Sequence, residues 1–320
     1  MKFEASSINK FRMGKSRAVA LSLATAVALA TSGCGSSKSG GAAGQLSFDE
    51  QARQAATDSD PASRARKLTA IGYNQGQARD LGGARSTLSD AAKAVRTIED
   101  PAERIRAAAR LARAYQAIDE SLESKKLLDT AGEEVDSVEE AEIKADLLVR
   151  LANSCTATGI NDQAAKYLTQ AEETAANVSD RVAQIGIDSR IATAYHTLGK
   201  SDDFRRLLDT AATKARELED ARRQAEALAD VAVTQLTADE ADAATATLDA
   251  ARQAAQAAED DYKRAHALAA IGDKLAAAKR NGQARTFYTA AQQAADKVTD
   301  NGLREEVLSK IRRGFGQIGG

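Results

Sequence analysis

The chain of 320 residues has no tryptophan, only two prolines, two cysteines and two histidines, and its aromatic content is 4%. Two cysteines cannot build the multiple disulfides of a small secreted domain, and two histidines offer few ligands for zinc. Alanine, leucine, arginine, glutamine and glutamate are abundant instead, and hydrophobic residues reach 43%. This composition favours helix almost throughout.

The sequence also lacks the motifs that mark catalytic and nucleotide-binding sites. It contains no glycine-rich phosphate loop, no Walker pattern and no nucleophile elbow. The net charge is −2, and without residues 1–33 the chain keeps 39 basic against 45 acidic side chains, a net charge of −6. A nucleic-acid-binding protein needs a basic face or domain. We therefore predict a non-enzymatic protein without cofactor, metal or nucleic-acid partner.

The N-terminal segment 1–33 has the pattern of a signal peptide. Residues 1–17 carry five basic side chains, and residues 18–31 form an uncharged apolar run. A span across a bilayer needs about 20 apolar residues, so this shorter run is typical of an export signal rather than a membrane helix. Cleavage after Ala30 is one possibility, because Ala28-Leu29-Ala30 fits the small-x-small pattern.

The stretch Thr31-Ser32-Gly33-Cys34 supports a second interpretation, because it resembles the lipobox of bacterial lipoproteins, although leucine is usual where Thr31 stands. Residues 34–46 are rich in glycine and serine and would form a flexible tether. The resemblance implies lipid attachment at Cys34 and a place in the cell envelope. Gly35 after the cysteine implies the outer membrane, facing the periplasm, in a Gram-negative cell. A secreted or periplasmic soluble protein is the alternative.

A 40-residue repeat runs through the rest of the chain without a gap. Three columns of the repeat keep their residue type at every step. They are an aliphatic column (Ile71, Leu111, Leu151, Ile191, Val231, Ile271 and Ile311), an alanine column (Ala91, Ala131, Ala171, Ala211, Ala251 and Ala291) and an acidic column (Asp60, Asp100, Glu140, Asp180, Asp220, Asp260 and Asp300). Units of this length that recur in register predict a solenoid.

Each unit has the pattern of two helices. The acidic column provides N-caps for the first helix, except that Glu140 is a poor cap and Ser137 is expected to start that helix. The first helix is expected to end near Gly159, Gly199, Asp239 and Gly282 in four of the units. The second helix is expected over about 15 residues, for example 163–178. A lone second helix with a Ser47–Glu50 capping box precedes the first unit, and a lone first helix over 301–316 follows the sixth.

The columns of residues 61–316 resemble the tetratricopeptide repeat (TPR). Ile191-Ala192, Tyr195, Gly199, Leu208 and Ala211 stand where the family has Leu-Gly, Tyr, the turn glycine, Phe and Ala. The tryptophan and the closing proline are missing. The period also exceeds that of the family, which is about 34 residues, and a longer second helix would explain the difference. HEAT-type repeats are the alternative repeat family. We predict an all-α, right-handed helical-hairpin solenoid over 47–320, with about six repeats and a half-repeat at each end.

The resemblance implies that the first helices line a binding groove and that the protein is an interaction scaffold. Candidate groove residues are Arg66, Tyr73, Arg106, Arg113, Asn153 and His196. The arginines would meet carboxylates of a protein or peptide partner. A structural component that forms homo-oligomers is the alternative function. Cys155 falls in a column with tyrosine and leucine and is expected in the core, and both histidines are expected to be exposed.

Overall fold

The structure is a computed structural model that describes residues 46–319. Residues Leu46–Gly320 form one compact unit. Within the described residues the chain forms fourteen α-helices and one 3-10 helix, and no strand. The predicted signal peptide (1–33), Cys34 and tether residues 34–45 lie outside the described residues, so cleavage and lipid attachment stay predictions.

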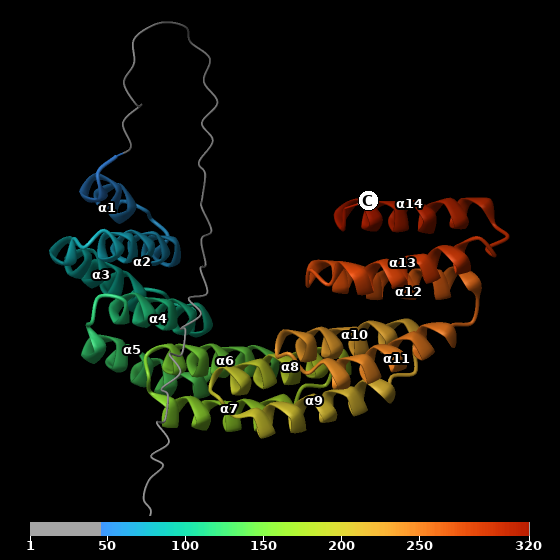
Figure 1. Cartoon of the computed structure of the whole chain (residues 1–320). Coiled ribbons are helices and arrows are strands. Elements are labelled where there is room, and N and C mark those ends of the chain that lie inside the picture. The colour runs from blue at the N-terminus through green and yellow to red at the C-terminus, as the bar shows by residue number, and fades with distance from the viewer. Residues whose placement is uncertain (1–45, 320) are drawn as a thin grey trace, which may run out of the picture. The chain divides into compact units, whose positions relative to one another are not determined.

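Twelve of the helices form six consecutive pairs (Figure 1). The first helices are α2 (Pro61–Gln77), α4 (Pro101–Gln116), α6 (Ala141–Ala157), α8 (Arg181–Thr197), α10 (Ala221–Thr237) and α12 (Asp261–Ala277). The second helices are α3 (Leu81–Arg96), α5 (Ser121–Glu134), α7 (Asn161–Ala175), α9 (Ser201–Arg216), α11 (Ala241–Gln256) and α13 (Asn281–Ala295). Single helices α1 (Phe48–Ala56) and α14 (Asn301–Gln317) stand at the two ends, and the 3-10 helix η1 (Val135–Ser137) follows α5.

The pairs stack through their first helices. Each first helix packs on its own second helix and on the first helices of the neighbouring pairs, from α2 through to α14. Each second helix also contacts the first helix of the following pair, and α1 packs on α2 and α3. This order of contacts confirms the predicted all-α, TPR-like solenoid of six helical hairpins with a half-unit at each end.

The acidic column caps the first helices as the sequence predicts. The carboxylates of Asp60, Asp100, Asp180, Asp220, Asp260 and Asp300 accept hydrogen bonds from backbone N–H groups of the first turn. Glu140 is the N-cap of α6 but makes no side-chain cap bond. The expected start at Ser137 is wrong, because Ser137 ends η1 and α6 begins at Ala141. The capping box of Ser47 and Glu50 is present at α1.

The turn between the helices of a pair repeats a left-handed residue every 40 positions. Its members have φ between 59° and 83°: Arg79, Asp119, Gly159, Gly199, Asp239 and Lys279. The N–H of the next residue bonds back to the helix, as from Ile160 to the carbonyl of Cys155 at 2.8 Å. Gly282 was expected in this turn, and that prediction is wrong, because Gly282 lies in the first turn of α13 and Lys279 takes the left-handed position.

The alanine column allows the helices of neighbouring elements to approach closely. Its six members are at most 2% exposed.

First helices have 16 or 17 residues and second helices 14 to 16, so the extra length of the unit is not concentrated in the second helix as expected. The second helix expected over 163–178 begins and ends slightly earlier, as α7 (Asn161–Ala175).

Candidate functional site: the arginine face of the first helices

Helix α4 shows which side of a first helix stays free. It is packed against α2, α3, α5 and α6, which together cover most of its circumference. On one side of α4, Arg110 and Arg113 are exposed and Glu103 and Arg106 are half-buried, at a spacing of three or four residues, whereas Ala107, Ala108, Ala109, Leu111 and Ala112 are buried. A spacing of three and four places side chains on one side of a helix. The free side of α4 is therefore strongly basic.

The same side of the neighbouring first helices continues this surface. We call it the arginine face and define it by Arg66 of α2, Arg106, Arg110 and Arg113 of α4, Arg150 of α6 and Arg190 of α8. Arg110, Arg150 and Arg190 occupy one column of the 40-residue repeat, and Arg66 and Arg106 another. Because consecutive first helices pack side by side, equal register positions lie next to each other across the stack.

Carboxylates neutralise only part of the arginine face. Arg106 pairs with Glu103 at 2.9 Å. Asp146 forms ion pairs with two arginines, at 2.7 Å from Arg150 and 3.7 Å from Arg190. Among the residues that the structure describes, Arg66, Arg110 and Arg113 form no ion pair. Three guanidinium groups on α2 and α4 thus keep all their hydrogen-bond donors free for an external acceptor.

The electrostatic surroundings of Arg110 reflect this excess of positive charge. Its pKa is lowered, first by burial and then by the positive charges of Arg66, Arg150 and Arg106, and Glu103 acts in the opposite direction. Like charges held this close repel one another in the absence of a ligand. An anionic group that binds among them would relieve that repulsion.

Five of the six predicted groove residues lie on this side of the first helices. Arg66 and Tyr73 of α2 are exposed, Tyr73 to 44%, and so are Arg113 of α4 and Asn153 of α6. Arg106 is half-buried beside Glu103.

His196 of α8 lies elsewhere. It is exposed but turned toward its own second helix, with its ring centroid 5.2 Å from that of Phe204 in α9. The structure therefore does not bring His196 to the five residues that share the free side of the first helices.

Sequence reasoning missed Arg110, Arg150 and Arg190. They form a column of three arginines at a spacing of 40, which is visible in the sequence. The signal is the same 40-residue recurrence that marks the aliphatic and alanine columns, here at polar positions.

The C-terminal first helices carry the opposite charge at these register positions. Glu226 and Asp230 of α10 and Asp273 of α12 lie at the surface or are half-buried. Lys274 pairs with Asp230 at 2.7 Å, and Lys310 of α14 lies 3.4 Å from Asp273. The free side of the first helices is thus basic from α2 to α8, whereas α10 and α12 carry acidic residues of which Asp230 and Asp273 pair with lysines.

The other candidate reactive groups have structural explanations. Cys155 is fully buried, as predicted, and burial raises the pKa of its thiol to about 12. His266 is half-buried rather than exposed as expected, and burial followed by the charges of Lys310 and Arg222 lowers its pKa. Within residues 46–319, no group of three or more potential metal ligands occurs, and no helix is long and apolar enough to cross a membrane.

A scan with protein-family models finds none that matches the chain, and a search of curated proteins finds no match. Solved structures resemble it at low identity. The crystal structure of Ton1535 from Thermococcus onnurineus NA1 is 16% identical, with a TM-score of 0.41, covering 82% of this chain and 95% of that one.

Two further solved structures are similar to it. A protein predicted to be a kinesin light chain of Podosopora anserina, with nearly identical TPR-like repeats, is 20% identical at a TM-score of 0.40 and covers 62% of this chain and 97% of its own. A Rap protein complexed with competence and sporulation factor is 13% identical, with a TM-score of 0.35, and the match covers 84% of this chain and 80% of that one. At these TM-scores the repeat architecture rests on the helix pairing of the chain itself.

Proposed function

We propose that the chain is a non-enzymatic scaffold that binds an acidic segment of a protein partner on its arginine face. The observation that carries the proposal is the set of three arginines, Arg66, Arg110 and Arg113, that have no carboxylate partner among the described residues and lie on adjacent first helices. Guanidinium groups form bidentate, charge-assisted bonds with carboxylates. An extended or helical segment with several Asp or Glu residues would satisfy these donors and remove the repulsion around Arg110.

The proposal includes an anchor in the cell envelope. The lipobox-like sequence before Cys34 and the Gly/Ser-rich stretch after it favour lipid attachment at this cysteine and display of the solenoid on a tether. A single acyl chain binds a membrane only marginally, so stable anchoring requires the several chains that lipoprotein maturation adds. An exported soluble scaffold is the alternative.

Crosslinking in the cells that produce the protein, followed by identification of the crosslinked proteins, tests the binding proposal. The test variant carries Arg66→Glu, Arg110→Glu and Arg113→Glu. The matched control reverses three exposed charges on second helices, with Lys125→Glu, Lys166→Glu and Arg216→Glu. We expect a partner with an acidic segment to crosslink to the wild type and the control and to be lost from the test variant.

Two results would contradict this proposal. The first is a crosslinking pattern that the three arginine reversals leave unchanged. The second is a concentration-dependent oligomer of the purified chain that accounts for all crosslinks, because it would favour the alternative of a structural component that assembles with itself. Light scattering over a range of concentrations measures the second.

Metabolic labelling with a fatty acid tests the anchor separately. We expect label on the wild type in the membrane fraction and none on Cys34→Ala. Cys155→Ala is the matched control and should keep the label, because only the cysteine after the leader is modified. Label that persists in Cys34→Ala, or a wild type found without label in the soluble fraction, would refute the anchor and leave the binding proposal intact.

A further inference from the structure

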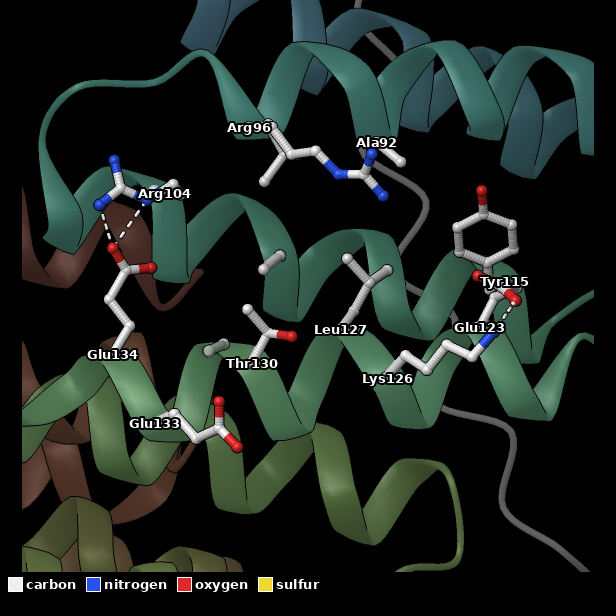
Figure 2. Close-up of a pocket in the computed structure, with 13 residues that line it drawn as sticks. Ala92, Arg96, Arg104, Tyr115, Glu123, Lys126, Leu127, Thr130, Glu133 and Glu134 are labelled. Atoms are coloured by element: carbon white, nitrogen blue, oxygen red, sulfur yellow. Dashed lines mark hydrogen bonds and ion pairs between the residues drawn. The ribbon is translucent and has the colours of Figure 1, made fainter.

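A cavity of about 520 Å³ opens between the second helices α3 and α5, above the first helix α4. Its lining includes the apolar groups of Ala92 and Val95 from α3, Ala108 from α4, and Leu127 and Ala131 from α5. Charged residues stand around it (Figure 2): the ion pair of Arg104 with Glu134 at one end and that of Lys126 with Glu123 at the other. The cavity lies in the layer of second helices, so it is separate from the arginine face.

At two other places between consecutive second helices the chain inserts an aromatic ring of its own, whereas Leu207 and Thr247 hold the same column, buried, on α9 and α11. We call the space between two consecutive second helices a slot. In the α5–α7 slot, Tyr167 of α7 is 4% exposed and its hydroxyl donates to the carbonyl of Leu128 at 3.4 Å. In the α11–α13 slot, Phe287 of α13 is 2% exposed and the Arg252 guanidinium lies 5.0 Å from its ring centroid.

The residue at the same position in the α3–α5 slot is Leu127, because Leu127, Tyr167 and Phe287 share one column of the 40-residue repeat. Leu127 is only half-buried, and the cavity remains beside it. On the facing helix, Ala92 occupies the column of Gly132 and Arg252, the residues that Tyr167 and Phe287 pack against. The α3–α5 slot therefore lacks the inserted ring that the α5–α7 and α11–α13 slots receive from this column.

Arg96 brings a guanidinium to the α3–α5 slot, as Arg252 does to the α11–α13 slot, although from a different column of the repeat. It stands one helical turn after Ala92 on α3, and its side chain runs along α3 in the direction of Ala92 at the wall of the cavity (Figure 2). Among the described residues the Arg96 guanidinium forms no ion pair. A guanidinium over an aromatic face is attracted by the ring quadrupole, as the Arg252–Phe287 contact illustrates.

We propose that the α3–α5 slot binds an aromatic side chain of a protein partner, with Arg96 over the face of the ring. The occupant would bury its ring where Tyr167 and Phe287 bury theirs in the other slots. Aromatic anchors in pockets contribute most of the binding energy of many protein interfaces. The slot would give the scaffold a second contact point, on the layer of second helices and independent of the arginine face.

Filling the slot from within tests the proposal. Leu127→Phe places the residue of the α11–α13 slot into the open one, and Thr130→Trp fills it from an exposed position of its wall. Leu122→Phe is the matched control, because it adds the same ring to α5 at a position that is 64% exposed. Thermal unfolding followed by circular dichroism verifies that each variant folds.

The probe is N-acetyl-phenylalaninamide, followed by NMR of methyl-labelled full-length protein. We expect saturable shifts of the Ala92, Val95 and Leu127 methyl groups, with a dissociation constant on the order of 1 mM for so small a ligand. The shifts should persist in Leu122→Phe and vanish for the remaining methyl groups in both Leu127→Phe and Thr130→Trp. Absence of saturable shifts in the wild type, or their persistence in both filled variants, would overturn the proposal.

Two comparisons test the role of Arg96. Arg96→Gln should weaken binding of the neutral probe about twofold to fivefold, the range of an exposed cation–π contact. N-acetyl-cyclohexylalaninamide, which has similar size and no π face, should bind the wild type more weakly than the aromatic probe and should not respond to Arg96→Gln. Equal binding of both probes would show that the slot accepts any apolar body and would refute the aromatic assignment.

Discussion

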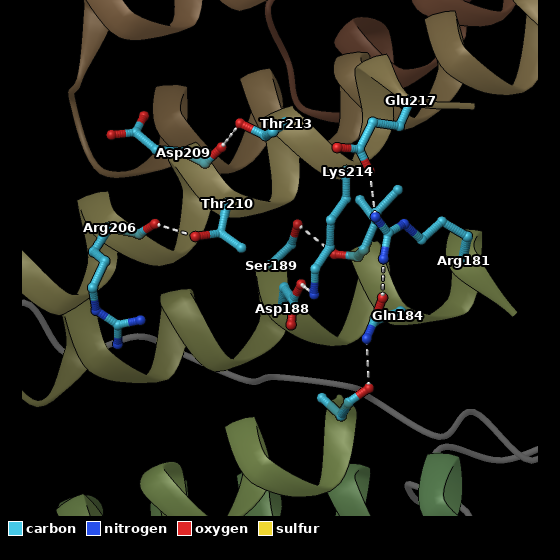
Figure 3. Close-up of polar contacts among 12 residues, drawn as sticks. Arg181, Gln184, Asp188, Ser189, Arg206, Asp209, Thr210, Thr213, Lys214 and Glu217 are labelled. Carbon is cyan, nitrogen blue, oxygen red and sulfur yellow. Dashed lines mark hydrogen bonds and ion pairs between the residues drawn. The ribbon is translucent and has the colours of Figure 1, made fainter. Parts of the chain in front are cut away.

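The Nζ atom of Lys214 lies 2.6 Å from Oδ2 of Asp188, in an ion pair enclosed between α8 and α9 (Figure 3). The side chain of Asp188 is 3% exposed and that of Lys214 is 19% exposed. The first, fifth and sixth pairs have Leu68, Leu228 and Leu268 in the column of Asp188, and Ala94, Ala254 and Ala294 in the column of Lys214. The fourth pair thus replaces an apolar contact by a charged one in both partners at once.

Removing one partner of this pair should destabilise the protein strongly. Lys214→Met leaves the Asp188 carboxylate buried without its cation, and we expect a loss of about 3 kcal/mol at pH 7, the lower end for a buried pair because Lys214 is partly solvated. The double variant Asp188→Leu/Lys214→Ala restores the residues of the other pairs and should lie within about 1 kcal/mol of the wild type. Urea unfolding followed by circular dichroism measures all three. A double variant as unstable as Lys214→Met would contradict this expectation.

The same pair predicts a pH dependence of stability. The pKa of Asp188 is raised because burial outweighs the attraction of Lys214. The folded state therefore binds a proton more readily than the unfolded state, so this contribution to stability is complete below the unfolded pKa of about 3.9 and is lost as pH rises through the folded pKa.

Removing Lys214 and removing the carboxylate should change this dependence in opposite ways. Lys214→Met removes the cation that lowers this pKa, so its decline in stability should extend to higher pH than in the wild type. Asp188→Asn should abolish the contribution of Asp188 to the change of stability with pH. Urea midpoints measured from pH 4 to pH 7 test both, with Asp209→Asn on the exposed side of α9 as control. Equal slopes in the wild type and in Asp188→Asn would refute the assignment.

The left-handed column predicts opposite effects for two substitutions in equivalent turns. Lys279 has φ of 59°, a conformation that costs an L-residue about 1–2 kcal/mol, so Lys279→Gly should stabilise the protein by about 0.5–1 kcal/mol after the added freedom of the unfolded chain is counted. Gly159 has φ of 78°, and Gly159→Ala should destabilise it by about 1 kcal/mol. Gly282→Ala is the control, because Gly282 lies in a helix with open space around its Cβ position, and it should be neutral or stabilising. A lower stability of Lys279→Gly would contradict the backbone strain inferred at Lys279.

The repeat made most of the fold predictable, because columns such as Ala91 to Ala291 report burial directly and Asp60 or Asp100 marks a helix start. Local preference misled where packing or register decides instead. The turn was predicted at Gly282 because glycine favours a left-handed backbone. Lys279 takes the left-handed position instead, because all six turns keep one register. The Asp188–Lys214 pair could not be foreseen, since each residue is ordinary on its own helix and only the facing of the two columns reveals the contact.

The candidate site was predictable in part for the same reason. The free side of the first helices follows from helical spacing, and Arg66, Tyr73, Arg106, Arg113 and Asn153 lie on it; that this side binds a partner stays a prediction. The α3–α5 slot did not follow from spacing, because a cavity depends on how far two helices stand apart and on which side chain reaches between them.

The α5–α7 slot predicts a strong dependence on glycine. A Cβ atom on Gly132 would collide with the Tyr167 hydroxyl oxygen, so Gly132→Ala should force the ring to move and cost about 1–3 kcal/mol. Tyr167→Phe removes that oxygen and should itself cost about 1 kcal/mol for the lost hydrogen bond to Leu128. The double variant should lose less than the sum of the two, as urea unfolding would show. Additive losses would mean that the ring does not pack on Gly132.

Arg110 allows the charge of the arginine face to be tested without any partner. Burial disfavours the charge of Arg110, and Arg66, Arg150 and Arg106 together repel it against the attraction of Glu103, so Arg110→Gln should raise the melting temperature by about 1 °C at 10 mM salt. At 0.5 M salt the part of the gain that comes from charge repulsion should disappear, since the screening length then falls to a few ångströms.

Arg150→Gln in the same column is the matched control for this prediction. Arg150 keeps a carboxylate at 2.7 Å, so its removal should give no gain at either salt concentration. If the arginine face keeps its unpaired charge for binding, Arg110→Gln should both raise the melting temperature and weaken binding of the partner. If Arg110→Gln and Arg150→Gln shift the melting temperature equally at low salt, the excess charge is not located where the arginine face requires it.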